Sequence, residues 1–209
     1  MGFFIHMLKK RAAALTGRLA DLALFVGIVL FGGIGSSWYM VEQGSRLTTE
    51  NIGPWVTWTN AARADADPYT RAHYARLGAL LMSADVAQNY VARADSEGTR
   101  LHSACDYEIT GHSIATHWWS ITVFDDRGSL IPNLANRYTF TSDTMAVNPD
   151  GTFTVALSRD ARPGNWLPVG GAGRVTVAFS MIDYGMQTVA TDAEMRQKLL
   201  PLIKKSSCR

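Results

Sequence analysis

The second half of the chain holds polar and aromatic side chains that could bind a small polar molecule. Tryptophan stacks on sugar rings, whereas asparagine and arginine side chains fix hydroxyl groups or an anion. The set consists of Trp118, Asp125, Asn133, Arg137, Asn165 and Trp166. It predicts a ligand cleft. The alternative is structural: the asparagines cap turns, Arg137 pairs with Asp125 or Asp126, and the tryptophans fill the core.

Catalytic and metal-binding patterns are weaker. Glycoside hydrolysis requires a pair of carboxylates that converge in space, and the candidates are Asp125, Asp126, Asp150 and Asp160. On an extended strand, His112 and His117 would point to opposite faces about 16 Å apart. The sequence has no CxxC motif and no histidine-rich tract, so we expect no metal and no cofactor. We assign no catalytic residues and favour a protein that is not an enzyme.

A β-sheet must position these side chains, because from Leu101 onward apolar and polar residues alternate with the period of a strand. Short strands are expected at 107–110, 119–123, 137–141, 153–157 and 175–181. Turn signals at 125–128 and 148–151 connect neighbouring strands closely. This pattern predicts a mainly β fold, an antiparallel β-sandwich or jelly-roll-like domain.

An amphipathic helix should pack against this domain. Asp67 and Pro68 place a cap and a first-turn proline in the expected order, and apolar residues recur on one side from 68 to 94. The alternative is a helix broken near Gly78 or Ser83. A short last helix is expected where Thr191 and Glu194 form a capping box, and Pro201 should end it. The tail at 204–209 should be disordered.

The N-terminal part predicts attachment to a membrane. The run 22–41 has no charged side chain, and the leader before it carries Lys9, Lys10, Arg11 and Arg18. About 20 apolar residues in a helix span a bilayer core, so we predict one transmembrane helix in contact with the lipid bilayer. Basic residues stay on the cytoplasmic side, which places the N-terminus inside and the rest of the chain outside. The alternative is a signal peptide cut before Ser36.

The domain organisation follows from these elements. We predict a basic cytoplasmic leader at 1–21, a transmembrane helix at 22–41, a juxtamembrane connector at 42–66, a helix plus β-sandwich domain at 67–186, and a C-terminal helix and tail at 187–209. Basic and acidic residues nearly balance beyond the membrane helix, so we expect no nucleic acid as partner.

Cysteine is scarce in this chain. Cys105 falls inside the predicted domain and Cys208 lies next to the C-terminus. An oxidising compartment would permit a disulfide between them. Because Cys208 lies on a tail that we expect to be mobile, we do not predict the bond.

Several motifs occur in order between residues 52 and 186. They are ADPYTRA at 66–72, WWSITVFD at 118–125, Pro132-Asn133 with Asn136-Arg137-Tyr138, Asp150-Gly151, and PGNWLP at 163–168. In these motifs the chain resembles the bacterial family called domain of unknown function 1214, in its short membrane-anchored branch. The resemblance implies a β-sandwich and the bacterial inner (cytoplasmic) membrane, with the main domain periplasmic. It also implies association with a neighbouring protein of the family called domain of unknown function 1254, and no established reaction.

Together these observations predict a single-pass, membrane-anchored extracytoplasmic protein. We expect a binding or accessory module that acts with a partner protein of the cell envelope. The rival interpretation is an envelope enzyme that acts on a glycan or another polar small molecule.

Overall fold

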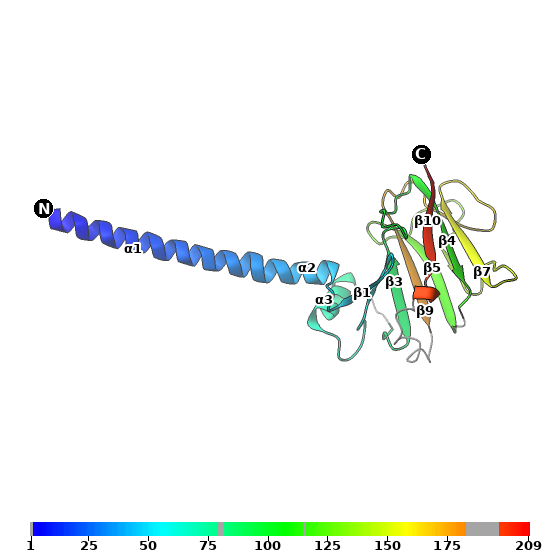
Figure 1. The fold of residues 1–209 in the computed structure, drawn as a ribbon, viewed down its shortest axis with the longest axis horizontal. Coiled ribbons are helices and arrows are strands. Elements are labelled where there is room, and N and C mark those ends of the chain that lie inside the picture. The colour runs from blue at the N-terminus through cyan, green and yellow to red at the C-terminus, as the bar shows by residue number, and fades with distance from the viewer. Residues whose placement is uncertain (1, 79–81, 115, 183–196) are drawn as a thin grey trace. The chain divides into compact units, whose positions relative to one another are not determined.

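The computed structural model describes residues 2–78, 82–114, 116–182 and 197–209. The chain divides into two units, Met1–Ser45 and Arg46–Arg209. The first unit is helical and the second is a β-sandwich with one packed helix, as Figure 1 shows. Each unit is described by itself below.

The first unit is a continuous helix. It runs from α1 (Gly2–Gly27) through a π-helical turn, η1 (Ile28–Ile34), into α2 (Gly35–Gln43) and ends at Gly44, whose φ is 73°. The segment Leu15–Gln43 has 29 residues and is long and apolar enough to cross a membrane. At 1.5 Å per residue it measures about 44 Å, against a bilayer core of about 30 Å. Large apolar side chains such as Phe25, Leu30 and Phe31 are exposed along it, and the predicted apolar helix is confirmed.

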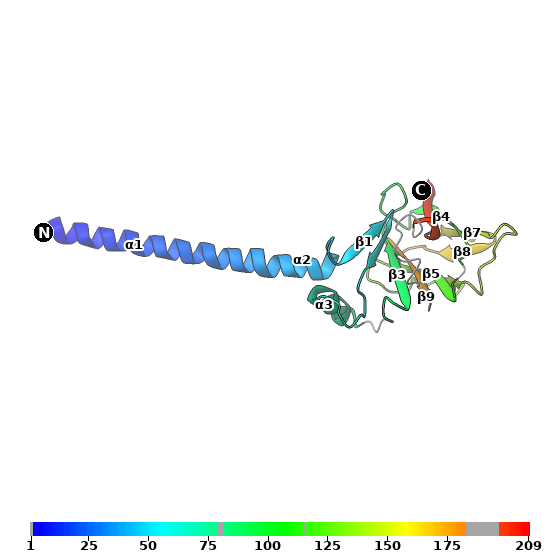
Figure 2. The same cartoon turned by 60° about the horizontal axis from the view of Figure 1, so that its bottom comes forward.

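The second unit consists of two sheets that face each other (Figure 2). The 6-stranded sheet has the order β1 (Thr49–Ile52), β2 (Trp55–Trp58), β3 (Ala87–Ala92), β9 (Val175–Ile182), β5 (Trp118–Asp125) and β6 (Thr139–Thr141). The 4-stranded sheet has the order β10 (Leu202–Cys208), β4 (Cys105–His112), β7 (Thr152–Ser158) and β8 (Asn165–Pro168). All pairs are antiparallel except β7 with β8. The predicted mainly β sandwich is confirmed, with one parallel pair at an edge.

The core lies between the two sheets. Alternate residues of β9, from Val175 to Met181, point into it, as the period of a strand requires. The indole of Trp119 on β5 stacks on the ring of Phe153 on β7 with centroids 4.9 Å apart. This contact joins the two sheets, and both side chains are almost fully buried.

The helix after Asp67 is shorter than predicted. α3 covers Pro68–Leu77, because Gly78 takes the left-handed conformation at φ 62° and closes the helix. The expected continuation to residue 94 is wrong: the chain instead forms β3, which pairs with both β2 and β9. The predicted start is confirmed, since Asp67 Oδ1 accepts hydrogen bonds from the backbone N–H groups of Tyr69 (2.9 Å) and Thr70 (3.0 Å).

The predicted disorder at 204–209 is also wrong. The segment Leu202–Cys208 is strand β10 at the edge of the smaller sheet, where Ile203 is buried beside Ile109. A disulfide joins Cys105 to Cys208, so the bond that we did not predict is present. Because the tail is mostly polar, the buried Ile203 alone was not enough to predict a strand from the sequence. Thr191 and Glu194 lie outside the described residues, and residues 197–199 are helical.

Candidate functional site

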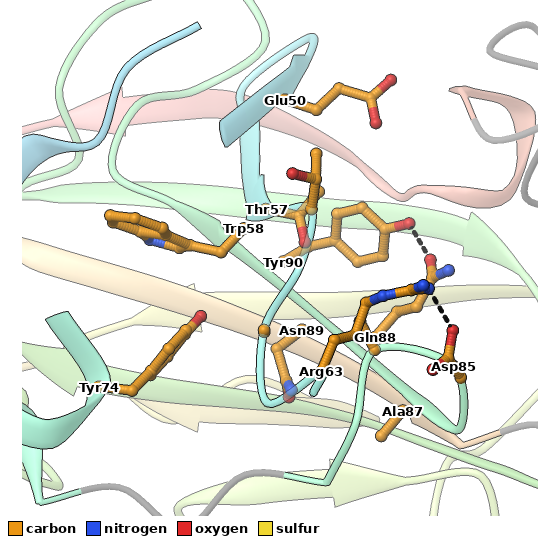
Figure 3. A pocket seen from close by; sticks show the side chains of 13 residues that line it. Glu50, Thr57, Trp58, Arg63, Tyr74, Asp85, Ala87, Gln88, Asn89 and Tyr90 are labelled. Atoms are coloured by element: carbon orange, nitrogen blue, oxygen red, sulfur yellow. Dashed lines mark hydrogen bonds and ion pairs between the residues drawn. The ribbon is translucent and has the colours of Figure 1, made fainter. Parts of the chain in front are cut away.

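A cavity opens where β2 and β3 separate. The two strands pair at only two positions, Trp55 with Ala92 and Val56 with Val91. Beyond these pairs the chain leaves the sheet toward α3 and returns at the start of β3. A cavity of about 430 Å³ lies in the gap (Figure 3). Its volume falls in the usual range for small-molecule sites, roughly 300–1,000 Å³.

The side chains around this cavity, here called the β2–β3 pocket, are mainly polar with aromatic rings among them. They come from β1, β2, the loop before α3, α3 itself and β3. The polar and aromatic members are Glu50, Thr57, Trp58, Arg63, Tyr74, Asp85, Gln88, Asn89 and Tyr90.

An aromatic group forms one wall of the pocket. The half-buried indole of Trp58 stacks on the His73 ring of α3, with centroids 4.2 Å apart and planes 21° apart. Tyr74 meets the edge of Trp58 at 5.9 Å. Burial raises the pKa of Tyr74 to about 12, so its hydroxyl stays neutral at physiological pH and can both donate and accept a hydrogen bond. These contacts also attach α3 to the sheet.

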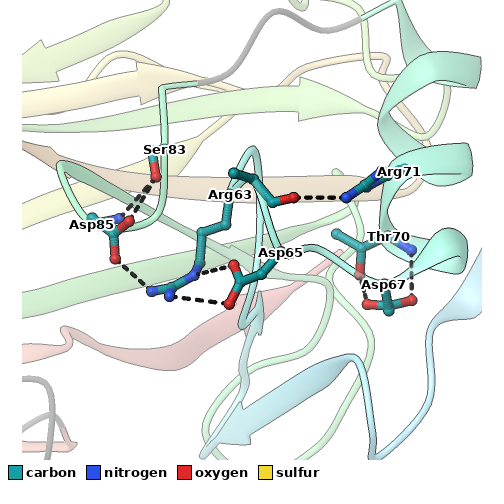
Figure 4. A network of polar contacts seen from close by, with 8 residues as sticks. Arg63, Asp65, Asp67, Thr70, Arg71, Ser83 and Asp85 are labelled. Carbon is teal, nitrogen blue, oxygen red and sulfur yellow. Dashed lines mark hydrogen bonds and ion pairs between the residues drawn. The ribbon is translucent and has the colours of Figure 1, made fainter.

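Arg63 organises the rim of the pocket (Figure 4). Its guanidinium donates to Asp65 Oδ1 at 2.9 Å and to Asp85 Oδ1 at 2.5 Å. The hydrogen bond to Asp65 raises the pKa of Arg63 and lowers the pKa of Asp65. Asp85 also accepts from the hydroxyl of Ser83 at 3.0 Å. This network connects the loop before α3 to the segment that enters β3.

The β3 side chains in the pocket present amide groups. Tyr90 donates its hydroxyl proton to Gln88 Oε1, and Ser180 on β9 donates to Asn89 Oδ1 at 2.8 Å. Within the described part of the chain, neither amide nitrogen of Gln88 and Asn89 has an acceptor. Both can therefore donate to a ligand.

The chemistry available here is recognition of a polar molecule. An aromatic face, a neutral phenol, amide donors and two carboxylates can together bind hydroxyl groups and the apolar face of a sugar ring. Across the residues that the structure describes, no three His, Cys, Asp or Glu side chains are grouped to hold a metal ion.

Asn133 and Arg137 of the predicted cleft lie in the loop before β6. Asn133 donates to the carbonyls of Ile131 and Arg137 and accepts from the Arg137 backbone N–H, each at 3.0 Å. The Arg137 guanidinium lies 5.7 Å from the Phe140 ring centroid and 5.8 Å from the Trp166 ring centroid. Neither Asp125 nor Asp126, both within the described part of the chain, forms an ion pair with it.

Asn165 and Trp166 begin β8 in the smaller sheet. The buried Asn165 side chain accepts from the Ala146 N–H and donates to the Ala146 and Thr154 carbonyls. Trp166 donates its indole N–H to the Ser158 carbonyl at 3.1 Å. The amide groups of both predicted asparagines are therefore used to hold loops, and Trp166 with Arg137 is the one close aromatic–cationic contact in the set.

The remaining two predicted residues lie at opposite ends of β5. Trp118 is half-buried and pairs with Ile182, whereas Asp125 accepts from the backbone N–H groups of Arg127 (2.9 Å) and Ser129 (2.8 Å) in the turn. The structure thus brings Asn133, Arg137, Asn165 and Trp166 into one region and leaves Trp118 apart from them. The other candidate carboxylates are also engaged locally, Asp150 with Thr152 and Asp160 with Arg209.

Sequence reasoning missed the β2–β3 pocket. Trp58 falls in the predicted connector at 42–66, and Tyr74, Gln88 and Tyr90 fall in the helix predicted over 68–94. The sequence signal for β3 is weak: Tyr90 and Val91 favour a strand, but a run as short as Ala87–Ala92 does not distinguish a strand from a helix.

Comparisons with known proteins agree with the predicted resemblance. Residues 86–183 match the family described as "Protein of unknown function (DUF1214)". The VPA0106 protein from Vibrio parahaemolyticus has a similar structure, with a TM-score of 0.53 and 22% identity over 68% of this chain and 36% of that chain. An uncharacterized protein from Burkholderia cenocepacia gives a TM-score of 0.42 and 16% identity, over 59% of this chain and 30% of that chain. This chain therefore spans about a third of the length of these solved structures. No curated protein matches it.

Proposed function

With a DUF1214 domain at residues 86–183, we propose that the protein is a membrane-anchored, extracytoplasmic binding module. Its β-sandwich binds a polar small molecule, of which a saccharide is the favoured class, in the β2–β3 pocket. The observation that carries this proposal is the pocket itself: about 430 Å³ lined by an aromatic wall and amide donors. Such a combination binds sugars through ring stacking and directed hydrogen bonds.

Two features support an extracytoplasmic location. The apolar helix Leu15–Gln43 is long enough to cross a bilayer, and the basic leader before it favours a cytoplasmic N-terminus. The Cys105–Cys208 disulfide supports the same side for the sandwich, because such bonds persist in oxidising compartments and are rare in the cytosol. We propose the bacterial inner membrane as the site of anchoring and the periplasm as the location of the sandwich.

A partner protein is part of the proposal. The similar Vibrio protein is longer, and this chain covers only 36% of it. The family resemblance favours a neighbouring protein of domain of unknown function 1254. Co-purification from a strain that expresses both proteins tests this, and recovery of the chain without that protein in mild detergent would contradict it.

Ligand binding can be tested on the full-length protein in a detergent without a sugar headgroup. Glucose, N-acetylglucosamine and their β-1,4-linked dimers are suitable probes, and the midpoint of thermal unfolding is the first readout. We expect at least one probe to raise the midpoint. The Trp58→Ala variant should weaken binding about tenfold, because aromatic contacts contribute about 0.5–1.5 kcal/mol beyond area burial.

The matched control is Trp166→Ala, which removes an indole outside the pocket. We expect this variant to retain the affinity of the wild type. If binding is lost in Trp166→Ala and not in Trp58→Ala, the ligand binds in the region of Arg137, Asn165 and Trp166 that the sequence predicted.

An enzyme acting on a glycan is the second candidate, because two carboxylates, Glu50 and Asp85, line the same pocket. The Arg63 guanidinium donates to Asp85 at 2.5 Å, so in this candidate Asp85 takes the role of nucleophile or base and Glu50 that of the acid. Turnover of p-nitrophenyl glycosides that disappears in Glu50→Gln would support this function. Absence of turnover with a probe that binds would exclude it for that probe.

A further inference from the structure

A second cavity lies at one end of the larger sheet, away from the β2–β3 pocket. Three arginines line it: Arg93 directly after β3, Arg100 in the following loop, and Arg174 directly before β9. Asp126, in the turn after β5, is the one acidic residue among them. The cavity therefore carries a net charge of +2, although the sandwich as a whole is nearly neutral.

Backbone hydrogen bonds hold the three arginines side by side. The Leu101 N–H donates to the Arg93 carbonyl at 3.0 Å, and the Val175 N–H donates to the Leu101 carbonyl at 3.2 Å. His102 forms an isolated bridge with Arg174. The Leu101 side chain is 1% exposed and fixes this segment in the core. The positions are therefore set by the fold before any ligand binds.

The arginine side chains are available for a ligand. Arg93, Arg100 and Arg174 are all exposed, and none of them forms an ion pair with a residue in the described part of the chain. Three other arginines of the sandwich, Arg63, Arg162 and Arg209, are each paired with an aspartate. Three arginines around one cavity produce a positive potential that attracts an anion.

We infer that this cavity binds an oxoanion, a phosphate group held by Arg93, Arg100 and Arg174. The guanidinium fork matches phosphate oxygens in pairs of parallel hydrogen bonds. The cavity measures about 120 Å³, which is below the roughly 300–1,000 Å³ of sites for whole drug-sized ligands. It accepts one charged group, either free phosphate or the phosphate of a lipid headgroup.

Phosphorus NMR on the full-length protein in neutral detergent tests the site with two probes, inorganic phosphate and the diester glycerophosphoglycerol. Binding of inorganic phosphate alone identifies free phosphate as the source, whereas tighter binding of the diester identifies a lipid headgroup. Both outcomes support the inference. A Kd above about 10 mM for both probes would overturn it.

Variants that remove either a positive or a negative charge from the cavity distinguish a specific phosphate site from general attraction to a positive surface. Arg100→Gln and Arg174→Gln should each weaken binding tenfold or more, and Asp126→Asn should tighten it several-fold because it removes the one opposing charge. Arg159→Gln is the matched control: it removes the same charge from an exposed arginine outside the cavity. Equal weakening by Arg159→Gln, or no gain in Asp126→Asn, would refute the site. An unchanged thermal midpoint shows that each variant is folded.

Discussion

Removal of the Cys105–Cys208 disulfide should lower the stability of the sandwich by about 2–4 kcal/mol. The bond joins residues that are 103 positions apart, so it closes a loop over most of the sandwich. The loop-entropy estimate for about 100 residues is about 4.7 kcal/mol at 25 °C, and measured values are usually lower. For a protein of 150–250 residues, each 1 kcal/mol moves the thermal midpoint by about 2–4 °C. We therefore expect a decrease of about 4–16 °C.

The assay compares full-length wild type with the Cys105→Ser/Cys208→Ser double variant. Near-ultraviolet circular dichroism is the readout, because Trp55 and Trp119 are buried and rigidly packed in the sandwich, whereas Trp38 and Tyr39 of the apolar helix are exposed. Dithiothreitol should bring the wild type to the midpoint of the double variant. It should leave the double variant itself unchanged, which controls for other effects of the reductant.

A midpoint that is the same in wild type and double variant would refute the reasoning on stability. The location is tested separately by alkylation of the protein in intact membranes. If both cysteines react with a thiol reagent without prior reduction, the bond is absent in the cell, and the support that it gives to an oxidising compartment is lost.

Three further predictions concern the fold and can be read from unfolding curves. Asp67→Ala should cost about 1 kcal/mol at pH 7, while Asp67→Asn should cost little because asparagine also caps helices. Burial acts to raise the pKa of Asp67, but the hydrogen bonds from Thr70 and Tyr69 lower it. The stability from this ionisation is therefore present above the unfolded pKa of about 3.9 and is lost as the pH falls through the folded pKa. A cost of Asp67→Ala that stays the same as the pH is lowered from 7 into the acid range would contradict this. Gly111→Ala should cost about 1–3 kcal/mol, because a Cβ there would lie 2.7 Å from Phe153 Cζ in the core; a neutral result would show that Phe153 can move. Trp119→Ala should cost about 3–5 kcal/mol through loss of its buried stack on Phe153, and a cost below 1 kcal/mol would mean that this contact does not hold the sheets together.

The strands that bury one face were predictable from the sequence. Val175, Val177 and Phe179 alternate with polar or small residues, and the two-residue period leaves only one way to place them against a core. The helix start at Asp67 was predictable for a similar reason, since the cap is a local interaction. Such features depend on neighbours in the sequence, which one chain displays directly.

Features that depend on distant partners were not predictable. Strand β10 is stabilised by pairing with β4 and by a disulfide across 103 positions, and nothing within its polar sequence indicates these partners. The β2–β3 pocket arises because two strands pair over two positions and then separate, which is a property of the register. For Asn133 and Asn165 the structural alternative to the predicted cleft holds, because their amides bond to nearby backbone groups.

The central claim, a polar ligand in the β2–β3 pocket, is tested most directly by a crystal structure of the protein with the saccharide that gives the largest thermal shift. The account predicts electron density for a sugar ring beside Trp58, within hydrogen-bonding distance of Gln88 or Asn89. A ring bound elsewhere, at Trp118 or at Trp166 and Arg137, with the β2–β3 pocket occupied only by water, would contradict it.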